Sequence, residues 1–122
     1  MKSTVLYVED NDNNIRLVER ILQRRTAVDL VVATTGKEGL RLAQADPPRL
    51  ILLDRRLPDM HGDEVLRELK AAQPTAAIPV VVLSGDAEQD HAAGVLALGA
   101  EGFLSKPFDI HQFLAIVDRF CP

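Results

Sequence analysis

Three carboxylates follow two short apolar segments of this chain and are placed to act together. Glu9 and Asp10 come directly after segment 4–8, and Asp54 comes directly after segment 50–53. Carboxylates held close together raise one another's pKa values unless a cation compensates. Mg²⁺ suits such oxygen ligands, because it keeps several waters and takes few protein ligands. Ca²⁺ prefers more ligands than the sequence brings together here, and Zn²⁺ prefers Cys or His, which are absent nearby. We therefore expect a Mg²⁺ site.

Two further polar side chains follow later apolar segments. Ser84 follows segment 80–83, and Lys106 comes shortly after segment 102–104. Mg²⁺ and the lysine would balance the three carboxylates, which leaves a nearly neutral cavity that can receive a phosphoryl group. A carboxylate can accept a phosphoryl group as a nucleophile if the transferred oxygens are neutralised and held in line. Asp54 is the best placed carboxylate for this reaction, with Lys106 and Ser84 beside the phosphoryl oxygens.

The elements that must position these residues are five short apolar segments, rich in β-branched residues: 4–8, 30–33, 50–53, 80–83 and 102–104. Nearly continuous apolarity is typical of strands buried on both faces. Helix-length stretches with apolar residues at helical spacing separate the segments. The pattern predicts an α/β fold, (βα)₅, in which helices cover both faces of a parallel sheet.

Five such strands favour an open, doubly wound sheet of the flavodoxin-like kind, a three-layer sandwich with strand order 2-1-3-4-5. Its switch point lies between the first and third strands, where the three carboxylates are expected. Thr35-Gly36-Lys37-Glu38 reads as a capping box that opens the second helix, and Asp109 with Gln112 looks similar for the fifth. Residues 87–98 are the expected fourth helix.

Length and composition indicate one domain, residues 1–122, with a substantial core. The net charge of -4 gives no basic surface for nucleic acid. The sequence shows neither an apolar run long enough to span a membrane nor a leader, so we expect a cytoplasmic protein that binds no membrane. The single cysteine, Cys121, fits a reducing compartment and is expected to be a terminal residue without a role.

Short motifs follow the apolar segments in chain order: Val8-Glu9-Asp10-Asn11, then Leu52-Leu53-Asp54-Arg55-Arg56-Leu57-Pro58 with Gly62, Ser84, Gly99-Ala100, Phe103, and Lys106-Pro107. Each motif is weak alone, but together they cover almost the whole chain and are highly specific. They resemble the receiver domains of two-component response regulators, the CheY-like superfamily. Receivers joined to hybrid histidine kinases and stand-alone receivers are both similar to this chain, and the sequence does not separate them.

The resemblance implies phosphorelay signalling. A histidine kinase or a histidine phosphotransfer protein would donate a phosphoryl group from a phosphohistidine to Asp54. The receiver would catalyse its own phosphorylation and its slow dephosphorylation without being a dedicated enzyme. By the same resemblance, Asp10 and Asp54 would bind Mg²⁺ directly, Glu9 through water, and Arg56 through its backbone carbonyl.

The resemblance also implies a conformational switch. Ser84 would move onto the phosphoryl group and Phe103 would turn inward, which would change the surface of the fourth helix, the fifth strand and the fifth helix. The Lys106-Pro107 bond resembles a cis peptide that would aim the lysine at the site, although trans is the default for such a bond. The downstream protein is unknown, and the sequence gives no argument for or against a dimer that forms on phosphorylation.

Arg56 and Asp86 stand two residues beyond Asp54 and Ser84, at positions that flank the route of the attacking water in this family. We hypothesise that they pair across the site and tune the lifetime of the aspartyl phosphate. The alternative is that they are two solvated loop charges without effect.

Three other functions remain as alternatives. A haloacid dehalogenase-type phosphatase also uses an Asp after a strand, but it needs a second Asp where this chain has Arg56. A flavodoxin-like FMN carrier needs a phosphate-binding loop, which the acidic run 9–12 would repel. A receiver that only docks partners and is not phosphorylated would need none of the key side chains that are present here.

Overall fold

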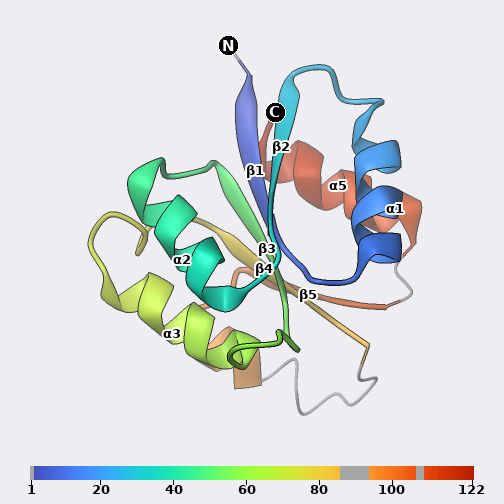
Figure 1. Ribbon diagram of the computed structural model, residues 1–122. Helices are drawn as coiled ribbons and strands as arrows, with labels where there is room; N and C mark the ends of the chain where they lie inside the picture. Colours follow the sequence, from blue (N-terminus) through green and yellow to red (C-terminus); the bar gives the residue numbers. More distant parts are fainter. Residues whose placement is uncertain (1, 86–93, 107–108) are drawn as a thin grey trace.

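The computed structural model describes residues 2–85, 94–106 and 109–122 (Figure 1). Its strands are β1 (Ser3–Val8), β2 (Val28–Ala33), β3 (Leu50–Asp54), β4 (Val80–Ser84) and β5 (Gly102–Ser105). They form one parallel five-stranded sheet in the order β2-β1-β3-β4-β5. The predicted fold class and strand order are confirmed, and the strand bounds differ from the expected ones by no more than two residues.

Helices cover both faces of the sheet, as a parallel sheet requires. The described helices are α1 (Asp12–Leu22), α2 (Gly36–Ala45), α3 (Gly62–Ala71) and α5 (Ile110–Phe120). Residues 94–97 are also helical; they belong to the expected fourth helix, and residues 87–93 of that helix lie outside the described part of the chain. Figure 1 shows α1 and α5 on one face of the sheet and α2 and α3 on the other. None of the described helices is long and apolar enough to cross a membrane.

The core consists of two clusters, one on each face of the sheet. Successive side chains of a strand point to opposite faces. Val5 and Tyr7 of β1 therefore pack towards α1 and α5, whereas Leu6 and Val8 pack towards α2 and α3. Strands β3 and β4 are buried along their whole length.

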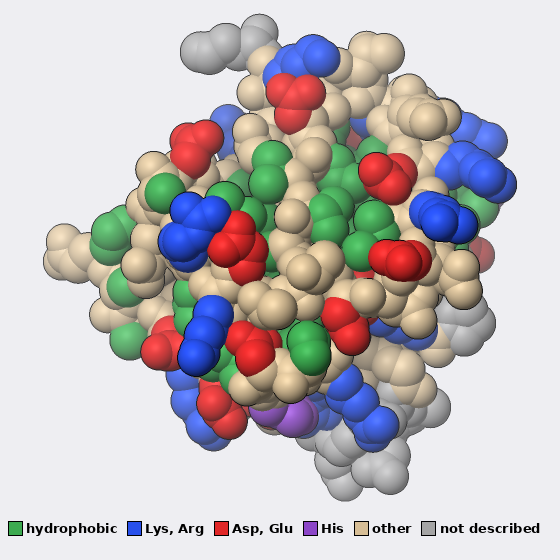
Figure 2. Space-filling model, viewed as in Figure 1, with side chains coloured by type: hydrophobic (Ala, Val, Ile, Leu, Met, Phe, Trp, Pro, Cys, Tyr) green, Lys and Arg blue, Asp and Glu red, His purple; other side chains and the backbone are tan. Residues whose placement is uncertain are grey.

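Strand β2 differs from the expectation of burial on both faces. Asp29 and Val31 are exposed, because β2 is an edge strand of the sheet. Figure 2 shows hydrophobic side chains on this side of the molecule, bordered by charged residues of the flanking elements. The same edge position explains why the apolar pattern missed the first two residues of this strand, Val28 and Asp29.

The N-cap bond of each expected capping box is present, while the Glu38 carboxylate binds Arg41. The Thr35 side chain accepts from the backbone N–H of Glu38, and Asp109 accepts from the backbone N–H groups of His111 and Gln112. A cap of this kind satisfies N–H groups that have no partner within the helix. The start of α2 therefore lies where the sequence predicts it.

Cys121 is a core residue, which corrects the expectation of a terminal residue without a role. Its side chain is 6% exposed and packs in the cluster between the sheet and α5. Burial raises the pKa of the thiol. The backbone N–H of Cys121 donates to the carbonyl oxygen of Val117 at 2.7 Å, so the hydrogen bonding of α5 extends to this residue.

Gly62 marks a close approach between α3 and the loop that follows β3. A Cβ at this position would lie 2.5 Å from the carbonyl oxygen of Asp54 and 2.7 Å from the Cα of Arg55. Both are backbone atoms, which cannot rotate away. We expect Gly62→Ala to lower the free energy of unfolding by about 3 kcal/mol, measured by urea denaturation. Gly94→Ala, where a Cβ meets nothing within 4 Å, is the control and should not destabilise the fold. Equal urea midpoints for Gly62→Ala and wild type would contradict this account.

Candidate functional site

A cavity of about 370 Å³ opens at the carboxyl ends of β1, β3 and β4. It is lined by Glu9, Asp10, Asn11, Asn14, Asp54, Arg55, Arg56, Ser84, Gly85 and Lys106. The cavity lies where the strand order reverses between β1 and β3, which is the usual ligand position in doubly wound sheets.

The three carboxylates meet in this cavity. One oxygen each from Glu9, Asp10 and Asp54 lies within 4.8 Å of the others. Glu9 and Asp54 are buried, whereas Asp10 is exposed. Two buried carboxylates and one that solvent reaches form an oxygen-only donor set, which fits a hard cation that retains part of its water shell. The residues present therefore fit Mg²⁺.

Lys106 joins two of these carboxylates. Its Nζ donates to Oε1 of Glu9 at 2.7 Å and to Oδ1 of Asp54 at 3.0 Å. The backbone N–H of Lys106 donates to the carbonyl oxygen of Ser84 at 2.7 Å, which fixes the end of β5 beside the end of β4. Burial disfavours the ammonium, but the Glu9 hydrogen bond and the Asp54 charge outweigh burial and raise the pKa of Lys106.

The two buried carboxylates differ in their preferred protonation. Burial would raise the pKa of Glu9, yet its hydrogen bonds, first that from Lys106, lower it. Burial and the neighbouring Glu9 raise the pKa of Asp54 to about 6 although Lys106 lies beside it. Without a metal, Glu9 therefore holds its negative charge and Asp54 takes up a proton more readily than a free Asp.

This difference predicts how stability depends on pH in EDTA. The folded pKa of Asp54 lies above its unfolded value of 3.8, so between pH 3.8 and about 6 the folded state binds the extra proton. The contribution of Asp54 to the free energy of unfolding is therefore largest at low pH, and it falls as pH rises through that window. Above that window, ionisation of Asp54 should lower the free energy of unfolding by on the order of 3 kcal/mol relative to the protonated form. Asp54→Asn should therefore gain stability over wild type as pH rises from 4 to 7 in urea unfolding with EDTA. A difference that does not change with pH would contradict the prediction.

The remaining predicted site residues fall into three groups: those that line the cavity, one that packs against the core, and those outside the described residues. Ser84 and Arg56 line the cavity, Ser84 as a buried side chain at the end of β4. Phe103 is partly buried and packs against the core cluster on the α2 and α3 face, outside the cavity lining. Asp86 and Pro107 lie outside the described residues, so their pairing and peptide-bond predictions stay predictions.

Sequence reasoning missed two residues that contact Glu9. The hydroxyl of Tyr7 and the amide Nδ2 of Asn14 each donate to Oε1 of Glu9 at 3.0 Å. Burial, and then the Glu9 charge, raises the pKa of Tyr7, so its hydroxyl stays protonated and can donate. A signal was present: strand alternation places residues 7 and 9 on the same side of β1, and Tyr7 is the one hydroxyl among apolar neighbours in residues 5–8.

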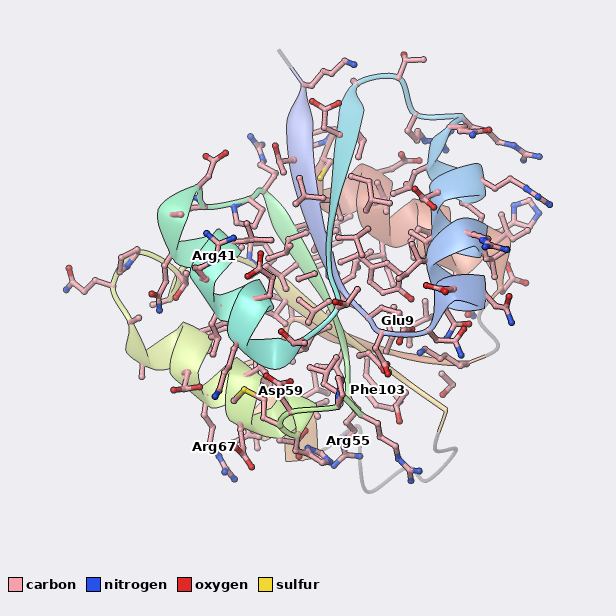
Figure 3. All side chains as sticks on the ribbon, in the orientation of Figure 1. Glu9, Arg41, Arg55, Asp59, Arg67 and Phe103 are labelled. Carbon is pink, nitrogen blue, oxygen red and sulfur yellow. The ribbon has the colours of Figure 1, made fainter. Side chains whose placement is uncertain are left out.

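Two contacts that the sequence did not reveal hold the loop after β3. The guanidinium of Arg55 binds Asp63 in the first turn of α3 through two hydrogen bonds, of 3.1 and 3.2 Å. The carboxylate of Asp59 accepts from the backbone N–H groups of Gly36 and Lys37, at 2.7 and 2.9 Å, and these bonds lower the pKa of Asp59. Figure 3 shows Asp59 beside the start of α2 and Arg55 lower in the same loop. The loop that carries Arg56 is thus tied to both α2 and α3.

Comparison with known proteins gives matches along nearly the whole chain. A family model for the response regulator receiver domain matches residues 5–118. The alkaline phosphatase synthesis transcriptional regulatory protein PhoP of Bacillus subtilis is 35% identical over 118 residues, which cover 96% of this chain and 48% of that protein. The polar-differentiation response regulator DivK of Brucella ovis is 29% identical over 98% of this chain and 97% of that protein. This chain therefore spans about half the length of some curated relatives and nearly all of others.

Solved structures share the fold of this chain along nearly its whole length. The receiver domain of the sensor histidine kinase PA1611 from Pseudomonas aeruginosa, with a magnesium ion coordinated in its active site cleft, has a TM-score of 0.87 and 28% identity, over 98% of each chain. The chemotaxis response regulator CheY4 of Vibrio cholerae has a TM-score of 0.88 and 26% identity, over 98% of this chain and 99% of that one. The same fold thus occurs in a domain from a kinase and in a chemotaxis protein.

Proposed function

This chain belongs to the response regulator receiver domains of two-component systems, which are signalling domains, and on that premise we propose that Asp54 accepts a phosphoryl group from a phosphohistidine. The donor would be a histidine kinase or a histidine phosphotransfer protein. The observation that carries the proposal is that Lys106 Nζ lies within hydrogen-bond distance of both Glu9 and Asp54 in the cavity where the carboxylates converge.

The proposed reaction is a direct transfer. A carboxylate oxygen of ionised Asp54 attacks the phosphorus, the P–N bond to the donor imidazole breaks, and a P–O bond forms in an aspartyl phosphate. The imidazole leaves and is reprotonated from solvent. Such a transfer has a loose transition state with its charge spread over three oxygens, so the residues act mainly by positioning and by charge.

Each residue has a defined part in this proposal. Glu9, Asp10, Asp54 and the backbone carbonyl of Arg56 would hold Mg²⁺, with Glu9 acting through water. The ion would supply positive charge that offsets the phosphoryl oxygens. Lys106 would exchange part of its contact with Asp54 for a phosphoryl oxygen.

Phosphorylation would then change the conformation of the domain surface. Ser84, which lines the cavity as a buried hydroxyl, would bind the phosphoryl group. Phe103 of β5 pairs in register with Val82 of β4, packs against the core, and would follow Ser84 inward. The surface of residues 94–98, β5 and α5 would change as a result, and an unknown downstream protein would read that change. Arg56, at the cavity lining, and Asp86 would tune the lifetime of the aspartyl phosphate.

The chemical nature of the adduct tests this function. Phosphoramidate carries a P–N bond and can replace the unknown phosphohistidine donor. We expect the protein to gain one phosphoryl group from phosphoramidate in the presence of Mg²⁺, and neutral hydroxylamine to remove it, because hydroxylamine cleaves acyl phosphates. An adduct that resists hydroxylamine would point to a phosphate ester, as on a serine, and would overturn the proposal.

A further inference from the structure

Three hydrogen-bond donors converge on one oxygen of Glu9. Tyr7 Oη and Asn14 Nδ2 each lie 3.0 Å from Oε1 of Glu9, and Lys106 Nζ lies 2.7 Å from the same atom. None of these three bonds uses the second oxygen, Oε2. Figure 3 shows Glu9 where β1 ends and the chain turns into α1. One oxygen of this carboxylate is therefore anchored in the protein by three donors.

The two neutral donors are held by the fold itself. Tyr7 lies within β1, is fully buried, and packs in the core cluster on the α1 and α5 face. Asn14 lies in the first turn of α1, and its backbone N–H donates to the Asn11 side chain that caps the helix. Tyr7 cannot leave Glu9 without disturbing the core, and the backbone of Asn14 is fixed in the first helical turn by the Asn11 cap. Such partners of a metal ligand set its orientation.

Lys106 is a different kind of partner. It also binds Asp54, and in the proposed function it transfers part of its contact to the incoming phosphoryl group. Glu9 then needs other donors if its orientation is to survive the reaction. Tyr7 and Asn14 are the donors among the described residues that contact Glu9 and have no proposed role with the phosphoryl group.

We propose that Tyr7 and Asn14 are positioning residues that anchor Oε1 of Glu9, so that Oε2 keeps its orientation towards the Mg²⁺ site throughout phosphoryl transfer. The inference rests on the proposed function, because it assumes that Glu9, Asp10 and Asp54 hold the metal. The competing explanation is that Glu9 merely satisfies a buried phenol, in which case the contact contributes to stability and not to metal binding.

Mg²⁺ affinity separates the two explanations. We would titrate magnesium chloride into the full chain by calorimetry, for wild type, Tyr7→Phe and Asn14→Ala. Loss of a residue that orients a metal ligand commonly weakens metal binding by roughly tenfold or more. We expect about tenfold weaker binding for Tyr7→Phe and a smaller loss for Asn14→Ala, whose side chain is only half-buried.

A matched variant controls for stability. Thr75 is also fully buried, and its hydroxyl donates to the carbonyl oxygen of Leu69 at 2.6 Å, with no contact to the cavity. Thr75→Val removes a buried hydroxyl as Tyr7→Phe does. It should destabilise the fold in urea and leave Mg²⁺ affinity unchanged.

Tyr7 supplies a second readout that needs no variant. It is the one tyrosine of a chain without tryptophan, so emission excited in the tyrosine band comes from this residue. Mg²⁺ should change the emission of wild type and of Asn14→Ala, each with the affinity that calorimetry gives.

The outcomes distinguish failure of the proposed function from failure of the positioning role of Tyr7 and Asn14. Wild type that binds no Mg²⁺ would overturn the proposed function, and the positioning role with it. If wild type binds Mg²⁺ but both Tyr7→Phe and Asn14→Ala match its affinity, the positioning role alone is wrong. If Tyr7→Phe does not fold, Asn14→Ala and the tyrosine emission decide: unchanged affinity together with unchanged emission would overturn the inference.

Discussion

Asp54→Asn is expected to abolish phosphorylation of this chain. The amide has nearly the shape of the carboxylate but lacks the anionic oxygen that attacks phosphorus. Glu9 and Lys106 remain in the variant and keep their 2.7 Å contact, so the loss would not reflect a collapsed site. We would incubate wild type and variant with acetyl phosphate, with Mg²⁺ or with EDTA, and record intact masses. Wild type should gain one phosphoryl group from acetyl phosphate when Mg²⁺ is present and none when EDTA is present. The variant should gain none in either condition.

A carboxylate outside the cavity provides the control for this experiment. Asp118 is an exposed residue of α5 that pairs with Arg25. Asp118→Asn makes the same chemical change and should gain the phosphoryl group as wild type does. Equal adducts on wild type and Asp54→Asn would show that another residue is the acceptor.

Lys106→Met is expected to slow phosphorylation by roughly 10²- to 10³-fold. Methionine keeps much of the apolar stem but removes the ammonium that contacts Glu9 and Asp54. The transferred oxygens then lose a positive partner. Removal of one partner from a buried ion pair also costs about 3–5 kcal/mol. The Lys106 side chain is only 17% exposed, so we expect a clear loss of stability as well.

The rate and the stability are measured separately. A time course of intact mass with acetyl phosphate and saturating Mg²⁺ gives the rate, and urea unfolding confirms that the variant is folded at the assay temperature. Lys2→Met is the control, because Lys2 pairs with Asp29 on the surface and both side chains are more than half exposed. Its rate should equal that of wild type. A Lys106→Met rate within twofold of wild type would contradict the proposed role of the ammonium.

Much of the sheet could be predicted because its signals are local. Apolar runs locate β1, β3 and β4, which are buried on both faces, and the residue after each run identifies the edge of the sheet that carries the site. The first two residues of the edge strand β2 were missed, because exposed Asp29 interrupts the apolar pattern. Cys121 was misjudged because its position in the chain does not show that the residue capping α5 faces the core.

The charged residues of the site could be predicted for a similar reason. Glu9, Asp54 and Lys106 stand at strand ends, and parallel topology brings those ends together. The contacts around them could not be predicted. Hydrogen bonds such as that of Tyr7 to Glu9, or the pair of Arg55 with Asp63, depend on side-chain rotamers and on the packing of one element against another. Sequence periodicity places residues on faces but does not set distances between side chains.

The most direct test of the central claim identifies the phosphorylated residue itself. Borohydride reduces an acyl phosphate to an alcohol, which converts a phosphorylated Asp into homoserine and releases phosphate. Wild type would be treated with acetyl phosphate and Mg²⁺, reduced, digested, and mapped by peptide mass spectrometry. We expect homoserine at position 54 and unreduced side chains at Glu9 and Asp10. Reduction at either of those residues instead, or a phosphoryl group that survives borohydride on another side chain, would contradict it.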